Sequence, residues 1–194
     1  MIRRLVSLVR RPVSLVQRLV RRPVKMFDAS VPPASAPVGY KAVAGYLGGD
    51  TPHVWTNDEW HRFRNLHKLP IWVRSDPGFV NPEDDAFAAL ERLYQLKVPK
   101  GSTIVMDLET AVSFQYVHTF HAVMKWAGYF AWVYGSASTV FDNPRADGYW
   151  VADYAGKGPF MYNHRWVKAT QYAAGPNYDS SLVLYWQYSN RLWK

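Results

Sequence analysis

The chain has 194 residues, of which 48% are hydrophobic, and it contains no cysteine. This length suits a single domain with at most an appendage, and the lack of cysteine excludes disulfides and thiolate metal sites. The net charge of +8 belongs to residues 1–25, which hold eight basic side chains and no acid, because the other 15 basic residues are matched by 15 acids.

Residues 1–25 form a basic arm with an internal repeat. The hexapeptide Leu-Val-Arg-Arg-Pro-Val occurs at 8–13 and again at 19–24. Between Pro12 and Pro23, Leu and Val side chains share one helical stripe and the arginines lie mostly off it. The prolines limit each helix to about two or three turns, and helices this short are marginal alone. The arm should therefore need a partner to order it.

Several roles are compatible with this arm. A docking arm that lays its Leu/Val stripe on another protein fits the repeat best. An anionic membrane surface or a nucleic acid fits the charge, and a mitochondrial presequence fits the amphipathic, acid-free composition. No apolar stretch approaches the roughly 18 residues of a membrane span. A cleaved secretory signal is disfavoured because arginines interrupt every candidate apolar core.

Eight short apolar runs follow the arm, and each ends in polar, glycine or proline residues. They lie at 26–30, 42–47, 70–74, 103–106, 129–134, 149–154, 168–172 and within 181–188. Helical patterns separate several of them, at 57–66, 82–96 and 114–127.

Alternating strands and helices favour a parallel sheet. The sequence therefore predicts an α/β fold, in which residues 26–194 form a compact (β/α)8 barrel and residues 1–25 stay outside it as the arm. Because such barrels usually need about 200–250 residues, some crossovers should be loops rather than helices. An open doubly wound sheet is the alternative architecture.

Two carboxylates, Asp107 and Glu109, close the fourth run. Side chains at i and i+2 of a strand point to the same face, so these two should stand roughly 6–7 Å apart along the backbone. Like charges this close raise at least one pKa, and one protonated carboxyl beside an ionised one is the arrangement that glycosidic chemistry uses. Taken alone, such a pair is more commonly a solvated strand end with two surface acids.

Polar side chains also follow the other runs. Catalytic groups gather at the carboxyl ends of barrel strands, and an acidic cup with aromatic walls suits a neutral polyol such as a sugar chain. No Gly-rich phosphate loop is present, and His118 and His121 have no evident third metal ligand, so we expect no metal and no cofactor. The strand-end residues are Asp28, Arg74, Tyr134, Asp153, Tyr154, Gln171 and Tyr172, with Asp179 in the last loop.

In this order and spacing, the motifs resemble those of the family-25 glycoside hydrolases, the lysozyme-like muramidases that cut bacterial peptidoglycan. They are still more similar to a related group of glycoside-hydrolase-like domains from actinobacteria and their phages. The resemblance covers nearly all of residues 26–194. It rests on Phe-Asp-Ala-Ser at 27–30, the strand 104–109, Trp-Val-Tyr-Gly-Ser at 132–136, Trp-Val-Ala-Asp-Tyr at 150–154, and Thr-Gln-Tyr at 170–172 followed by Asp179.

The resemblance implies a role for each acid. Glu109 matches the proton-donating acid, and Asp107 matches the partner that stabilises the oxazolinium or oxocarbenium charge on the sugar, helped by the substrate's N-acetyl group. Asp28 and Asp179 match supporting carboxylates that tune this pair. The substrate-binding residues would be Tyr134, Asp153, Tyr154, Gln171, Tyr172 and Arg74.

Two functions remain open from the sequence. The carboxylates favour a glycosidase that acts on cell-wall peptidoglycan. The arm favours a non-catalytic structural or wall-binding component of a phage particle, tied into the assembly through residues 1–25. Either function would place the chain in a virion or at a cell envelope.

Overall fold

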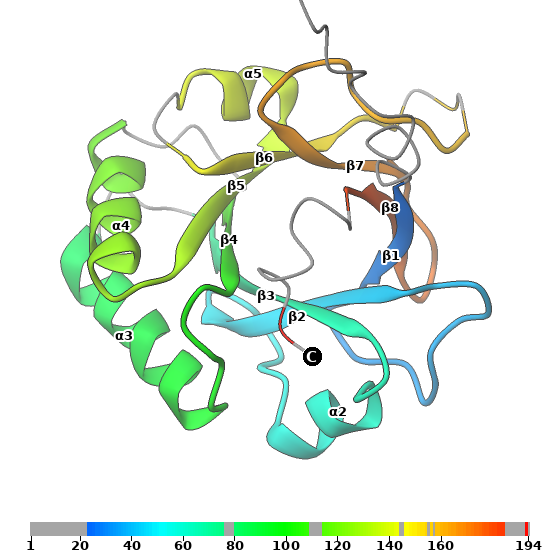
Figure 1. Cartoon of the computed structure of the whole chain (residues 1–194), viewed down its shortest axis with the longest axis horizontal. Helices are drawn as coiled ribbons and strands as arrows, with labels where there is room; N and C mark the ends of the chain where they lie inside the picture. The colour runs from blue at the N-terminus through cyan, green and yellow to red at the C-terminus, as the bar shows by residue number, and fades with distance from the viewer. Residues whose placement is uncertain are drawn as a thin grey trace, which may run out of the picture.

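The computed structural model describes residues 23–75, 80–108, 114–143, 146–154, 156, 158–184 and 193. Eight strands pair in chain order and close into a barrel (Figure 1). The predicted barrel is therefore confirmed, and the open doubly wound sheet is wrong. The strands are β1 (Val24–Asp28), β2 (Ala42–Gly49), β3 (His67–Arg74), β4 (Thr103–Leu108), β5 (Phe130–Ser136), β6 (Gly148–Ala152), β7 (Val167–Ala173) and β8 (Asp179–Val183).

Helices cover the flank of the barrel that runs from β2 to β6 (Figure 1). The first three match the predicted helical segments, whereas α5 is a five-residue helix, too short for a periodic pattern to reveal. The described residues between β1 and β2, between β6 and β7, and between β7 and β8 form no helix, as the short chain required. The described helices are α2 (Asn57–Arg62), α3 (Pro82–Gln95), α4 (Phe114–Trp126) and α5 (Ala137–Phe141).

The direction of β8 departs from the predicted parallel sheet. Strands β1 to β7 pair in parallel, but β8 is antiparallel to both β7 and β1. Only residues 174–178 join β7 to β8, and a parallel crossover needs a dozen residues or more. The chain therefore turns back as a hairpin, and Asp179 opens β8 instead of lying in a loop. The rest of the predicted eighth run, residues 185–188, lies outside the described residues.

The strands are buried on both faces, which explains their nearly continuous apolar runs. One core lies inside the barrel and receives side chains from all eight strands, among them Met26, Leu69, Val105, Trp132 and Val183. A second core fills the space between the strands and the helices and includes neighbouring residues such as Phe27, Ile104 and Met106. Alternate residues of each strand thus enter different cores, as the two-residue period of a strand requires.

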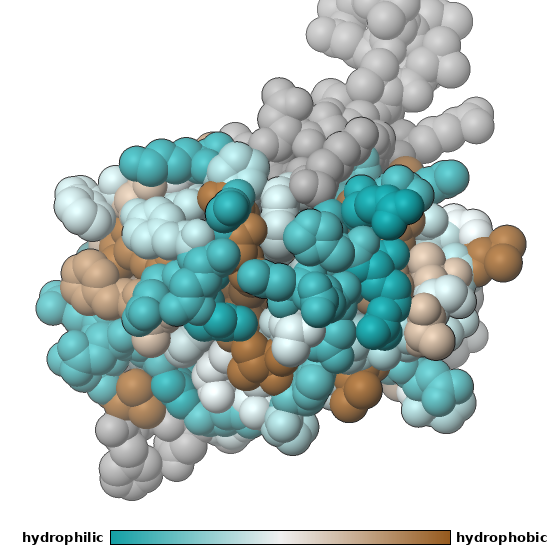
Figure 2. Space-filling view, turned by 90° about the horizontal axis from the view of Figure 1, so that it is seen from below, coloured by the Kyte–Doolittle hydropathy of each residue, from teal (hydrophilic) through white to brown (hydrophobic). Residues whose placement is uncertain are grey.

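The barrel begins two residues inside the predicted arm, because Val24 and Lys25 belong to β1. The rest of the arm, residues 1–22, lies outside the described residues. Seen from the α2 side, the surface is mostly hydrophilic and carries small separate hydrophobic areas (Figure 2). None of the described helices is long and apolar enough to cross a membrane.

The contact between Gly45 and Trp55 joins β2 to the outer core. Trp55 is fully buried, packs 4.8 Å from the ring of Trp60 and 5.5 Å from that of Phe63, and donates its indole N–H to the Ser30 carbonyl oxygen at 3.2 Å. A Cβ placed on Gly45 would lie 2.6 Å from the Trp55 ring. Glycine is therefore required there for close packing.

We expect Gly45→Ala to lower the free energy of unfolding by about 1–3 kcal/mol, because overpacking forces the indole out of its site. Urea denaturation measures the change. In a Trp55→Leu background, the same substitution should cost less than half as much, since the clashing ring is gone. An equal cost in both backgrounds would show that the indole is not the cause.

Candidate active site

Strand alternation brings polar side chains into the interior of the barrel at the end where the parallel strands finish. Val105 and Trp132 fill the inner core, and the residues two positions later, Asp107 and Tyr134, line a cavity at the carboxyl ends of the same strands. On β1, Asp28 follows the inner-core residue Met26 in the same way. The site therefore continues the inner core, with polar side chains replacing apolar ones where the strands end.

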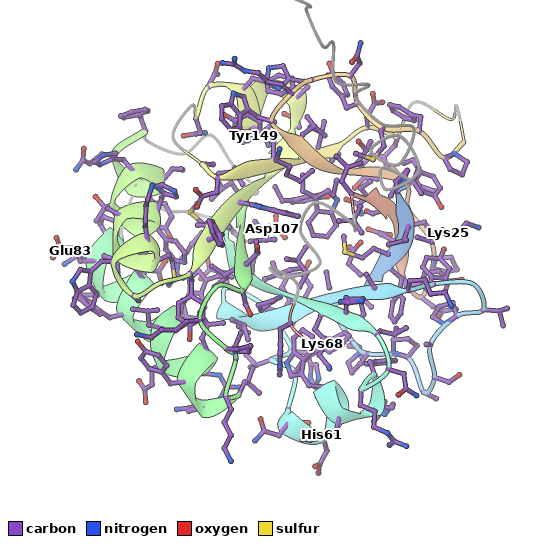
Figure 3. All side chains as sticks on the ribbon, in the orientation of Figure 1. Lys25, His61, Lys68, Glu83, Asp107 and Tyr149 are labelled. Carbon is purple, nitrogen blue, oxygen red and sulfur yellow. The ribbon has the colours of Figure 1, made fainter. Side chains whose placement is uncertain are left out.

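The cavity has a volume of about 180 Å³. Figure 3 labels Asp107 near the centre of the barrel. Three carboxylates and three tyrosines form most of the wall of the cavity, and Ile71 and Trp150 complete this wall. Its lining residues are Asp28, Tyr46, Ile71, Asp107, Tyr134, Trp150, Tyr154 and Asp179.

Asp28 and Asp179 face each other across the seam of the barrel. They are register partners in the antiparallel pairing of β1 with β8, and like charges directly opposite each other on paired strands are destabilising. Burial is the largest cause that raises the pKa of Asp28 well above its usual range, and the charges of Asp179 and Asp107 raise it further. Oδ1 of Asp28 is buried and receives no hydrogen bond from the described residues. Asp28 therefore holds a proton more readily than an ordinary aspartate does.

Asp107 is 4% exposed, and the hydroxyl of Tyr46 donates a long hydrogen bond to its Oδ2 at 3.4 Å. Tyr46 lies on β2, two residues after the inner-core residue Ala44. Strand alternation places Tyr46 on the same side of β2 as Ala44, so the signal for Tyr46 is its two-residue spacing within the strand and not a position at the strand end. Trp150 is a second site residue beyond the predicted set, and its signal is likewise its place in the strand β6, from which it points into the inner core.

A hydrogen-bonded chain fixes the far wall of the cavity. Tyr134 donates to Oε1 of Gln171, and the Gln171 amide donates to Oδ2 of Asp179 at 2.6 Å. The backbone N–H of Gly175 donates to the other Asp179 oxygen at 3.0 Å, and the Tyr154 hydroxyl lies 3.1 Å from that of Tyr134. Burial, followed by the neighbouring Tyr154 hydroxyl, raises the pKa of Tyr134. Tyr134 therefore stays neutral and keeps donating.

Four of the predicted substrate-binding residues do not line the cavity: Arg74, Asp153, Gln171 and Tyr172. Gln171 instead holds two residues of the wall by hydrogen bonds. Arg74 makes a two-bond ion pair with Asp85 of α3 and a further bond to Asp50. Asp153 is half-buried and its backbone N–H donates to the Gln171 carbonyl oxygen at 2.9 Å. Tyr172 follows Gln171, where the pairing of β7 with β8 is irregular, and is absent from the lining of the cavity.

Glu109, the predicted general acid, lies outside the described residues. Its role, and those of the other site residues, stay predictions. No group of three or more His, Asp or Glu side chains that could hold a metal ion occurs among the described residues.

Solved structures share this architecture at low sequence identity. The family-25 glycosyl hydrolase GHIP of Streptococcus pneumoniae superposes with a TM-score of 0.63 at 11% identity, over 91% of this chain and 95% of that one. The catalytic domain of endolysin ply40, from a bacteriophage of Listeria monocytogenes, gives 0.64 at 13% identity, over 84% and 93%.

The modular autolysin LytC of Streptococcus pneumoniae, solved with a synthetic peptidoglycan ligand, gives a TM-score of 0.59 at 15% identity, over 83% of this chain and 46% of that one. The sequence matches no protein-family profile and no curated protein. The chain has the fold of the family-25 glycoside hydrolases. The predicted resemblance is thus confirmed at the level of the fold.

The raised pKa of Asp28 predicts a pH-dependent stability. The folded state keeps the Asp28 proton to a higher pH than the unfolded chain does, so the free energy of unfolding falls as the pH rises through the raised pKa. Asp28→Asn removes this pH-dependent loss of stability, because an amide does not ionise. We expect the variant to be more stable than the parent at pH 7 by about 1–3 kcal/mol, because the amide leaves no charge buried beside Asp107 and Asp179, and the gain to shrink towards pH 4.

Urea denaturation at several pH values measures this difference. Asp84→Asn is the matched control, because Asp84 is an exposed acid in the first turn of α3 and its loss should cost about 0.3–1 kcal/mol through the helix dipole. An Asp28→Asn variant that is less stable than the parent at pH 7 would contradict the prediction that the buried Asp28 carboxyl destabilises the fold at this pH.

Proposed function

We propose that this barrel is a glycoside hydrolase that cleaves the glycan strands of bacterial peptidoglycan in the manner of a muramidase. One observation carries the proposal: Asp28, Asp107 and Asp179 meet in a single tyrosine-lined cavity at the carboxyl end of the barrel. The shared fold with a family-25 glycosyl hydrolase and an endolysin catalytic domain supports it. The autolysin that binds a synthetic peptidoglycan ligand supports the class of substrate.

The proposed mechanism divides proton transfer and charge stabilisation between two acids. Glu109, two residues after Asp107, donates a proton to the leaving glycosidic oxygen, which is general acid catalysis. Asp107, ionised, stabilises the positive charge that develops as the bond breaks, and the substrate's N-acetyl group assists at the anomeric carbon. Water then completes hydrolysis. Because the N-acetyl group takes part, the carboxyl spacings of simple retaining and inverting enzymes do not apply.

The remaining cavity residues would tune this pair and hold the sugar. Asp28 stores a proton next to the ionised Asp107, and Asp179 is held by Gln171 and Gly175 on both oxygens. The Tyr154 hydroxyl is positioned to hydrogen-bond a sugar hydroxyl, since Tyr154 is 51% exposed at the cavity mouth. Aromatic side chains of this kind present a flat apolar face together with a polar group.

Glu109→Gln should lower the release of reducing ends from purified peptidoglycan by at least ~10²-fold, the usual contribution of a general acid. Asp107→Asn should also lower it strongly, because the developing charge loses its partner. Circular dichroism and urea denaturation check that the fold persists. Glu91→Gln is the control, since Glu91 is an exposed acid on α3.

Unchanged turnover by Glu109→Gln would reject Glu109 as the acid. A wild-type chain that binds peptidoglycan but releases no reducing ends would instead support the non-catalytic wall-binding or particle component.

We also propose that residues 1–22 are a separate docking arm for a protein partner or assembly. The proposal is supported by the Leu-Val-Arg-Arg-Pro-Val repeat and by the confinement of the excess positive charge to this end. An anionic membrane or a nucleic acid remains the competing class of partner for the same charge.

Deletion of residues 1–22 keeps all of β1, which begins at Val24. Hydrolysis of soluble peptidoglycan fragments should stay within about twofold, whereas assembly followed by sedimentation velocity should be lost. Vesicles of phosphatidylcholine with phosphatidylglycerol and a DNA duplex test the competing partners. If deletion changes none of these measurements, the docking and surface roles both fail.

A further inference from the structure

A second cleft lies between α2 and α3 and encloses about 380 Å³. Lys68 lies near the start of β3 and Lys97 just before β4, whereas the carboxylates lie where the strands end. The cleft therefore belongs to the opposite end of the barrel. Figure 3 labels Lys68 and His61 on the α2 side, away from Asp107. The lining residues that matter here are Trp60, His61, Arg64, Lys68, Lys97 and Trp193.

Two indoles form the apolar part of this cleft. The rings of Trp60 and Trp193 lie 5.4 Å apart. Trp193 is held by its backbone, which donates to the Lys68 carbonyl oxygen at 3.1 Å and accepts from the Lys68 N–H at 2.5 Å. The cleft thus joins a segment near the end of the sequence to the start of β3.

The ionisable side chains in the described lining of the cleft are all basic, and its other polar residues are the uncharged Asn57 and Gln95. Lys68 is 4% exposed, and its ammonium lies 5.0 Å from the centre of the Trp193 ring. None of the described residues that line the cleft is acidic. Burial lowers the pKa of Lys68, and no carboxylate of the described lining offsets this cost. A bound anion would offset it.

Lys97 occupies a position where lysine is conformationally unfavourable. It follows the end of α3 with a φ of 54°, and its N–H donates to the Tyr94 carbonyl oxygen at 2.9 Å. Glycine is the usual residue at such a helix end because it adopts positive φ without steric cost. A lysine in this conformation places an exposed positive charge at the rim of the cleft, opposite the exposed Arg64.

We propose that this cleft is a second ligand site, which binds a phosphate group between Lys68 at its base and Arg64 and Lys97 at its rim. The cleft holds several basic side chains and no acid in its described lining, so a ligand with a single carboxylate would neutralise only part of its charge. A phosphate ester carries close to two negative charges at neutral pH and would neutralise more of it. Arginine and lysine are the usual phosphate partners. The indoles of Trp60 and Trp193 contact the apolar part of the ligand. The site does not depend on the proposed hydrolase activity.

Isothermal titration calorimetry on the full chain tests the proposal with three probes: inorganic phosphate, glycerol 3-phosphate, and vesicles of phosphatidylcholine with or without phosphatidylglycerol. Lys68→Met and Lys97→Gly should each weaken binding at least tenfold, while Lys41→Met, which removes an exposed lysine outside the cleft, should not. Binding of the soluble phosphates identifies a free ligand. Loss confined to the anionic vesicles identifies a lipid headgroup.

Lys97→Gly separates binding from folding. Since glycine suits the positive φ, this variant should raise the unfolding midpoint and still lose phosphate affinity. No binding of any probe by the wild type would overturn the proposal. Equal affinity in all three variants would also overturn it, because that binding would belong to other basic residues, including those of the arm.

Discussion

The seam where β8 pairs with both β7 and β1 is the constraint on which the site depends. A five-residue hairpin forces β8 to run antiparallel to its neighbours, so its first residue lies at the end where the parallel strands finish. Asp179 is thereby set opposite Asp28. If β8 were parallel, its first residue would lie at the other end of the barrel, far from Asp107. One short connection thus decides whether the carboxylates can act together.

Closure of the barrel also allows the fold to tolerate the destabilising polar groups of the cavity. The inner core is filled by large side chains such as Trp132 and Trp150, both essentially inaccessible to solvent. Directly above them the same strands present carboxyls and tyrosines, which include a buried Asp28 whose pKa is raised by burial and by like charge. Such local strain is sustained because the eight paired strands fix the backbone around it. Stability and function compete here within a few residues of each other along each strand.

The two ends of the barrel have opposite electrostatic character. The end that bears Asp28, Asp107 and Asp179 suits a neutral glycan and proton transfer. The cleft beside Lys68 is basic and aromatic, and its described walls come from α2, the end of α3, the start of β3 and Trp193. Because the barrel separates these two environments, a ligand at one end leaves the other accessible. The two proposed sites would therefore bind their ligands independently of each other.

The sequence by itself determined the eight strands, the three longer helices and the strand-end positions of Asp28 and Asp107, because these follow from periodicities of two and 3.6 residues within short segments. Only the tertiary structure decided the direction of β8, the chain of bonds from Tyr134 through Gln171 to Asp179, and the diversion of Arg74 to Asp50 and Asp85. It also decided the meeting of Lys68 with Trp193. These contacts join residues that are distant in sequence or depend on how the sheet closes, and local patterns carry no information about which distant segments become neighbours.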